Sequence, residues 1–177
     1  ITLKYLGEKG EGLSSLIKGA VSISTPCSLE DCAKTLSKGF SSFYGKHFIG
    51  RIIKKIKSKQ KIFPDYKPDI KSLERLTTFA EFDQAFTAPL LGFVSANDYW
   101  DKASSLFFIN NIKVKTLILN AKNDPFLSKR CFPVEETKKH PFVHLEMPEQ
   151  GGHVGFLKKG IHEVWSDLRA YEFLTTD

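Results

Sequence analysis

Two short segments of the sequence carry residue types that could act together as an acid and a base. Asp124 follows the apolar run TLILN and precedes a proline, and His153 follows two glycines in the segment PEQGGHVGFL. A carboxylate that accepts a hydrogen bond from one imidazole nitrogen leaves the other nitrogen free to take a proton from a serine hydroxyl. Asp124 and His153 therefore fit the acid and base of a hydrolase triad, although two such residues on successive loops can also be unrelated.

The apolar runs before these loops predict the strands that would position them. The segments GAVSISTP over 19–26 and VKTLILNA over 114–121 are short apolar runs, as in strands buried in parallel sheets. The segment FVHLEMPE over 142–149 alternates and is followed by QGGH, which contains two glycines. Functional side chains in open α/β sheets lie on loops beyond the carboxyl ends of the strands, which is where both candidates fall.

Helical patterns fill most of the remaining chain. Ser28 and Asp31 have the spacing of a capping box, and apolar residues follow at helical intervals at positions 29, 32, 33, 36, 40 and 43. A second pattern covers 48–56 and a third resumes after two prolines. The last predicted helix has one apolar face, made of Ile161, Val164, Trp165, Leu168 and Tyr171. This order predicts an α/β fold with a doubly wound, mostly parallel sheet and a helical insertion over about residues 28–97.

Other residues could compete for the same roles. Asp98 could serve as the acid, but it stands where a helix should begin, so capping explains it better. Ser24 and Cys27 follow the first strand, yet their segment lacks the strained turn with small neighbours that a nucleophile needs. Glu149 and Gln150 could shape the histidine loop or be ordinary polar residues, and the sequence does not separate the two readings.

The histidines and cysteines do not predict a metal centre. His47, His140, His144 and His162 have no metal-type spacing, and Cys27, Cys32 and Cys131 form no CxxC pair. We therefore expect neither a zinc site nor a disulfide framework, and no metal or organic cofactor. Unpaired cysteines favour a reducing compartment, and the sequence shows neither a signal peptide nor a run of about 18 apolar residues. These features predict a cytoplasmic protein, with contact to a membrane surface as an alternative.

The segments around the candidate residues resemble one family. TLILNAKNDPFL and PEQGGHVGFL, together with the upstream FAEFDQAFTAPLLGFVSANDYWDKAS, closely resemble the closing part of the YheT-like branch of the α/β-hydrolase superfamily. The resemblance covers essentially the whole chain and implies that Asp124 and His153 are the triad acid and base. It also implies a serine ester hydrolase of the carboxylesterase or lipase type, acting on a small-molecule or lipid ester.

The nucleophile of that family is not found in this sequence. The family's serine lies in a G-x-S-x-G elbow, and the 177 residues contain no such motif. ITLKYLGE resembles the helix that follows the elbow, and the only methionine is Met147. The resemblance therefore implies a C-terminal part of the hydrolase domain, inactive alone, whose partner is the missing N-terminal half of the fold.

A basic stretch suggests an alternative function. Residues 46–61 contain seven lysine or arginine residues and no acid, in a chain with a net charge of +6. A basic amphipathic helix can lie on an anionic membrane surface, here through Arg51, Lys54, Lys55 and Lys57. A non-catalytic interaction or membrane-surface module is thus the rival of the hydrolase, and a solvated helix face is the simplest reading of the charge. No nucleic-acid-binding motif accompanies the stretch, so nucleic acid is not an expected partner.

Overall fold

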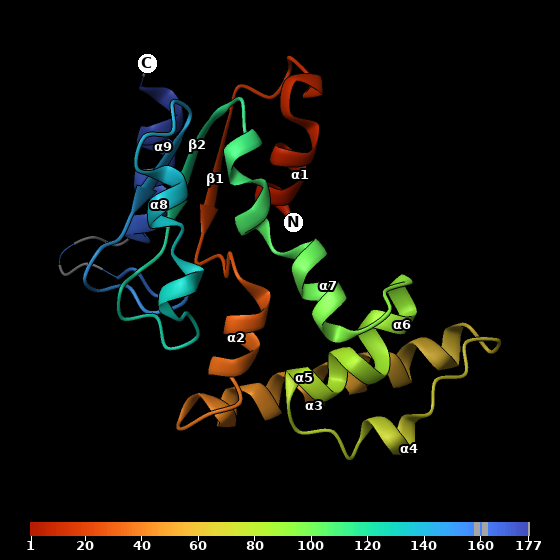
Figure 1. The fold of residues 1–177 in the computed structure, drawn as a ribbon. Helices are drawn as coiled ribbons and strands as arrows, with labels where there is room; N and C mark the ends of the chain where they lie inside the picture. The colour runs from red at the N-terminus through yellow and green to blue at the C-terminus, as the bar shows by residue number, and fades with distance from the viewer. Residues whose placement is uncertain (158–159, 161–162, 177) are drawn as a thin grey trace. The chain divides into compact units, whose positions relative to one another are not determined.

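The computed structural model describes residues 1–157, 160 and 163–176 and has an α/β fold (Figure 1). Ile161 and His162, which the sequence analysis places on a helix face and among the histidines without metal spacing, lie outside the described residues. The chain divides into two compact units, one of Ile1–Leu29 with Ala103–Asp177 and one of Glu30–Lys102. We refer to them as the sheet unit and the helical unit.

The sheet unit is built on three parallel strands in the order β1-β2-β3. The strands are β1 (Gly19–Ile23), β2 (Lys115–Leu119) and β3 (Val143–Glu146), and each lies within a segment that the sequence predicts as a strand. β2 is the middle strand and its Leu117, Ile118 and Leu119 are fully buried, which explains its continuous apolar run. β1 and β3 form the two edges of this sheet.

Helices cover both faces of the sheet, as the doubly wound prediction requires. α1 (Thr2–Lys9) and the 3₁₀ segment η3 (Ser105–Asn111) pack on one face, and α9 (Trp165–Thr175) packs on the other (Figure 1). The shorter helical elements of the sheet unit are η1 (Gly10–Gly12), η4 (Lys129–Cys131) and α8 (Val134–Thr137).

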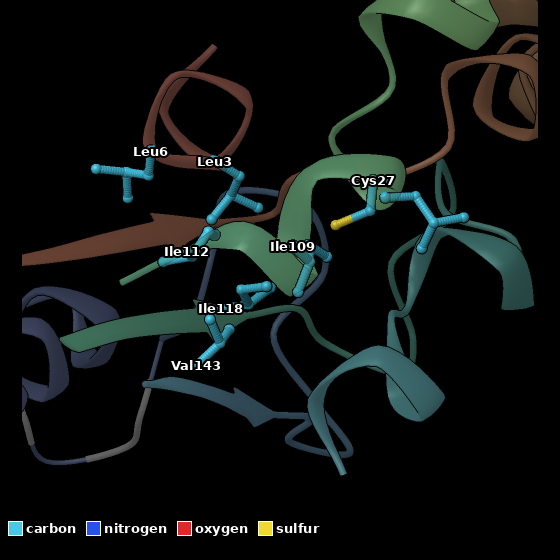
Figure 2. Packing of buried hydrophobic residues seen from close by; sticks show 8 residues of the cluster. Leu3, Leu6, Cys27, Ile109, Ile112, Ile118 and Val143 are labelled. Atoms are coloured by element: carbon cyan, nitrogen blue, oxygen red, sulfur yellow. The ribbon is translucent and has the colours of Figure 1, made fainter. Parts of the chain in front are cut away.

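Successive residues of β2 point to opposite faces of the sheet, so its side chains contribute to two separate hydrophobic cores, one on each face. Ile118 joins Leu3 and Leu6 of α1 and Ile109 of η3 in one core, shown in Figure 2. Leu117 and Leu119 contact the cluster around α9 instead. The sheet is thus buried on both sides, and its carboxyl-terminal edge can present loops without exposing the strands.

The buried face of α9 differs from the prediction. The apolar pattern places Leu168 and Tyr171 on the buried face, but they are 42% and 71% exposed, so this part of the prediction is wrong. Ser166 and Phe173 are buried in their place, and Phe173 packs with Leu117 and Leu119. Several apolar residues on different sides of a short helix do not tell which side will meet the sheet.

The helical unit contains no strand in the part of the chain that the structure describes. Its elements are α2 (Leu29–Thr35), α3 (Ser41–Ile62), α4 (Ile70–Leu73), α5 (Phe79–Phe82), the π-helical turn η2 (Asp83–Thr87), α6 (Ala88–Leu91) and α7 (Ala96–Ala103). Ile49, Ile53 and Ile56 of α3 pack with Leu73 and Phe82 in its core. That this unit is an insertion into a larger hydrolase domain stays a prediction.

The first predicted helix of this unit ends earlier than its apolar pattern suggests. α2 stops at Thr35, Gly39 adopts a positive φ of 51°, and a new helix begins at Ser41. Phe40 and Phe43, which the pattern assigns to the buried face of one continuous helix, are 77% and 69% exposed. Among the described residues, no helix has the length and apolar character that crossing a membrane requires.

Candidate active site

Asp124 lies on the loop that follows β2, with its carboxylate fully buried. The backbone N–H of Asp124 donates to the carbonyl of Ala121 at 3.2 Å, which turns the chain directly after the strand. Its Oδ1 accepts a hydrogen bond of 2.9 Å from the backbone N–H of Phe126. The side chain has no solvent exposure, so the carboxylate depends on protein donors such as this N–H in place of water.

His153 lies on the loop that follows β3, and two glycines make that loop possible. A Cβ atom on Gly151 would lie 2.7 Å from the Phe156 ring and 2.8 Å from the Ala121 Cβ, so the backbone must pass here without a side chain. Gly152 has a φ of 59°, which glycine adopts readily. The backbone N–H of Phe156 donates to the Gly151 carbonyl at 2.9 Å and closes the turn.

The two loops bring the predicted acid and base into direct contact. Nδ1 of His153 lies 2.8 Å from Oδ2 of Asp124. A carboxylate only accepts hydrogen bonds, so this contact favours the tautomer that carries the proton on Nδ1 and leaves Nε2 as an acceptor. The side chain of His153 is 31% exposed, and its ring contacts the Phe126 ring at a tilt of 55° with centroids 4.6 Å apart. The ring is therefore held on one side and accessible on the other.

A second set of contacts joins the same two loops, and the sequence pattern indicates only part of it. Asn123 donates from Nδ2 to Oε1 of Gln150 at 2.7 Å and accepts from the N–H of Gly152 at 2.8 Å. The N–H of Lys122 donates to the carbonyl of Pro148 at 2.8 Å, and its ammonium pairs with Glu149. Gln150 and Glu149 thus do shape the histidine loop. The sequence gives no indication of the role of Asn123 other than its position next to Asp124.

Asn120 plays a similar role between the ends of β1 and β2. It is completely buried, accepts from the N–H of Thr25 at 2.8 Å and donates to the carbonyl of Thr25 at 2.9 Å. A buried amide at the end of an apolar strand is unusual enough to mark a structural role, and that signal was available in the sequence.

The competing candidates lie in environments that do not suit them. Asp98 is in α7 of the helical unit, where it pairs with Lys102 at 2.6 Å and accepts from the N–H of Val94 at 3.1 Å. Its pKa is lowered by the hydrogen bond with Lys102, and its own N–H donates to Ser95 Oγ. Asp98 therefore stabilises the start of a helix.

Neither residue considered as a replacement nucleophile is exposed. Cys27 is fully buried, and burial raises the pKa of its thiol to about 12, which suppresses the reactive thiolate. Ser24 has a positive φ of 52°, a strain that the sequence does not predict, but its hydroxyl is buried without a hydrogen-bond partner among the described residues. Its neighbours Ile23 and Thr25 also differ from the small residues of an elbow.

The cysteines and the described histidines do not assemble a metal site. Within residues 1–157, 160 and 163–176, no group of three or more histidine, cysteine, aspartate or glutamate residues is placed to hold a metal ion. Within the same residues, Cys27, Cys32 and Cys131 are not joined to one another by a disulfide bond.

Comparison with known proteins relates the chain to ester hydrolases, although no family model matches it. YheT of Escherichia coli, an esterase by name, is 32% identical over 169 residues, which are 94% of this chain and 49% of that protein. A monoacylglycerol lipase of Saccharomyces cerevisiae is 30% identical over 93% of this chain and 37% of its own length. Phospholipase ABHD3 of Bos taurus is 25% identical over 89% of this chain and 38% of its own length.

These similarities and the parallel sheet define the class of the protein: it has the fold of the C-terminal half of an α/β-hydrolase. Within that class, the chain is homologous to proteins of the YheT-like branch over nearly its whole length. The motifs in its last 100 residues predict the same branch. The chain spans less than half of the length of each of the three relatives described above.

Proposed function

We propose that this chain supplies the acid and the base of a serine ester hydrolase, with Asp124 orienting His153. The observation that carries the proposal is the 2.8 Å contact between His153 Nδ1 and a carboxylate with no solvent exposure. The two residues follow neighbouring parallel strands, at the edge of the sheet where α/β enzymes place their working groups.

The geometry suits general acid–base catalysis of acyl transfer. The hydrogen bond to Asp124 keeps the proton of neutral His153 on Nδ1, so Nε2 can accept the proton of a serine hydroxyl as the oxygen attacks an ester carbonyl. The imidazolium that forms is stabilised by the buried carboxylate and then protonates the leaving alcohol. Water repeats the sequence on the acyl-enzyme and releases the carboxylic acid.

The serine in this mechanism comes from outside the 177 residues. We propose that it lies in an elbow carried by the N-terminal half of the same fold, which would also pair with the open edge of β1. The absence of a G-x-S-x-G motif and the burial of Ser24 and Cys27 support this assignment. The names of the relatives, which include an esterase, a lipase and a phospholipase, favour a carboxylic ester of a lipid or a small alcohol as substrate.

Joining the elbow and early strands of a YheT-like relative to this chain tests the proposal. The joined enzyme should hydrolyse a simple aryl ester, and His153→Ala should abolish turnover. His144→Ala is the matched control, since His144 is an exposed residue of β3, and it should leave turnover unchanged. Full activity in the His153→Ala enzyme would disprove the role of His153.

The chain alone provides a second test of the same assignment. Without a serine in an elbow, it should show no turnover above its own His153→Ala variant. Turnover that exceeds this control would mean that a nucleophile within the 177 residues suffices, and would refute the view that the serine lies elsewhere.

A further inference from the structure

The solvent-facing side of α3 carries positive charge that its own helix does not neutralise. α3 contains seven lysine or arginine residues and no acid. Lys57 pairs with Glu74 of the same unit, so its charge is compensated. Arg51, Lys54 and Lys55 are exposed and form no ion pair within the residues that the structure describes. Lys46, Lys59 and Lys61 are exposed as well and form no ion pair among the same residues, so the uncompensated charge runs along most of the helix.

Large apolar side chains lie on the same side of α3, at both of its ends. Residues three, four or eight positions apart lie on one face of a helix. These spacings separate the successive members of the series Phe40, Phe43, Arg51, Lys54 and Ile62. Phe40 is 77% exposed, and Phe43 and Ile62 are each 69% exposed.

The opposite side of α3 is accounted for, because Ile49, Ile53 and Ile56 pack into the core of the helical unit. Phe40 and Phe43 contact the edge of the Tyr44 ring, with centroids 5.7 Å and 6.1 Å away, but most of their surface stays exposed. A shallow depression of about 530 Å³ runs along the charged stretch of α3, lined by His47, Arg51, Lys54, Lys55, Ser58 and Lys59.

We propose that this surface, the α3 basic face (Phe40, Phe43, Arg51, Lys54, Lys55 and Ile62), docks on an anionic lipid bilayer. The three cations are attracted to acidic headgroups. The apolar side chains at the two ends can enter the boundary between headgroups and acyl chains. A helix of 22 residues spans about 33 Å, so the two ends form separate apolar anchors on either side of the charges.

The combination of charge and exposed apolar ends distinguishes a bilayer from other partners. A second copy of this chain would bring the same cations together and be repelled. A nucleic acid would use the charges, but binding of its backbone would not require Ile62, an aliphatic residue that no base can stack on. A bilayer uses both kinds of residue at once. This surface is independent of the Asp124–His153 pair and of the proposed hydrolase activity.

Vesicle flotation of the full 177-residue chain tests the charged part of the proposal. Vesicles of phosphatidylcholine with 30% phosphatidylserine should carry the chain upward, and vesicles of phosphatidylcholine alone should not. Each cation near such a surface contributes about a fivefold gain in partitioning, so Arg51→Gln/Lys54→Gln/Lys55→Gln should weaken binding about a hundredfold. Lys9→Gln/Lys138→Gln/Lys139→Gln is the control, because it removes the same charge from exposed residues of the sheet unit and should bind as the parent does.

A second pair of variants tests the apolar part. Phe43→Ser/Ile62→Ser should weaken binding to the anionic vesicles at least tenfold, whereas Leu16→Ser/Phe107→Ser, at exposed sites of the sheet unit, should not. Circular dichroism checks that each variant keeps its helices.

Three results would overturn the proposal. The first is equal flotation with neutral and anionic vesicles, and the second is equal loss in the two triple variants. The third is binding to single-stranded RNA that matches the vesicle affinity and is unaffected by Phe43→Ser/Ile62→Ser, which would assign the surface to polyanions in general.

Discussion

Replacing Asp124 with asparagine tests the proposed tautomer of His153 with almost no change in shape. The carboxylate accepts two hydrogen bonds, from the N–H of Phe126 at 2.9 Å and from His153 Nδ1 at 2.8 Å. An amide has one oxygen and one NH₂ group, so it can accept only on one side. Because the site is buried, the choice between the two orientations decides which nitrogen of His153 carries the proton.

The Phe126 contact should decide that choice. If the amide oxygen faced His153, the NH₂ group would oppose the fixed N–H of Phe126, and a buried donor without an acceptor costs about 1–3 kcal/mol. If the oxygen faces Phe126, the NH₂ group donates to Nδ1 and the imidazole proton moves to Nε2, at little cost because the ring can exchange tautomers. The second arrangement should therefore dominate, and it removes the lone pair that would accept the serine proton.

Two measurements follow the change. A ¹H–¹⁵N spectrum of this chain, taken at a pH at which the ring is neutral, should show the proton of His153 on Nδ1 in the parent and on Nε2 in Asp124→Asn. In the joined enzyme, kcat should fall about 10⁴-fold, which corresponds to about 5.5 kcal/mol of lost transition-state stabilisation. Asp98→Asn, at the helix-capping acid, should alter neither. A parent-like spectrum in Asp124→Asn, or a loss of kcat below tenfold, would refute the reasoning.

Two further predictions concern stability. Gly151→Ala places a Cβ within 2.8 Å of both the Phe156 ring and Ala121, so it should lower the free energy of unfolding by about 1–3 kcal/mol and lower Tm. Gly12→Ala is the control, because its Cβ would meet open space and should leave Tm unchanged. Equal melting temperatures for the two variants would contradict the close approach at Gly151. For Cys27, the thiol is protonated in both states below its ordinary pKa of 9.0, and between 9.0 and about 12 only the unfolded state loses the proton. Through this group, the free energy of unfolding should therefore fall by about 1 kcal/mol from pH 8 to pH 10. Urea titrations at the two pH values should show a smaller fall for Cys27→Ala. An equal fall in the parent and the variant would contradict the burial of the thiol.

Much of the sheet unit could be predicted because its signals are local. The apolar run of β2 reflects burial on both faces, and the glycines after β3 reflect a close approach and a positive φ. The face of α9 could not be predicted in the same way. Which side of that helix meets the sheet depends on Phe173 fitting against Leu117 and Leu119, which are more than 50 residues away in sequence.

The residues of the site also divide into those with a signal in the sequence and those that depend on the folded arrangement. That Asp124 and His153 should lie close together could be predicted from residue type, order and family resemblance, and the structure places them in contact; their catalytic roles stay a prediction. Asn123 and Phe126 could not, because a polar and an aromatic residue on a loop have many uses and only the folded arrangement selects one. The apolar pattern also did not predict the break between α2 and α3: α2 ends at Thr35, and the positive φ of Gly39 interrupts the helical path before Ser41.

The contacts between Asn123, Gln150 and Gly152 join the loops after β2 and β3 within the sheet unit itself. The entropy of ordering the proposed acid and base is therefore lost when this unit folds. A nucleophile approaching the pair meets a surface whose geometry is already set by the spacing of two hydrogen-bonded strands. If the proposed serine is carried by the rest of the fold, its own placement relative to this pair is what remains to be set.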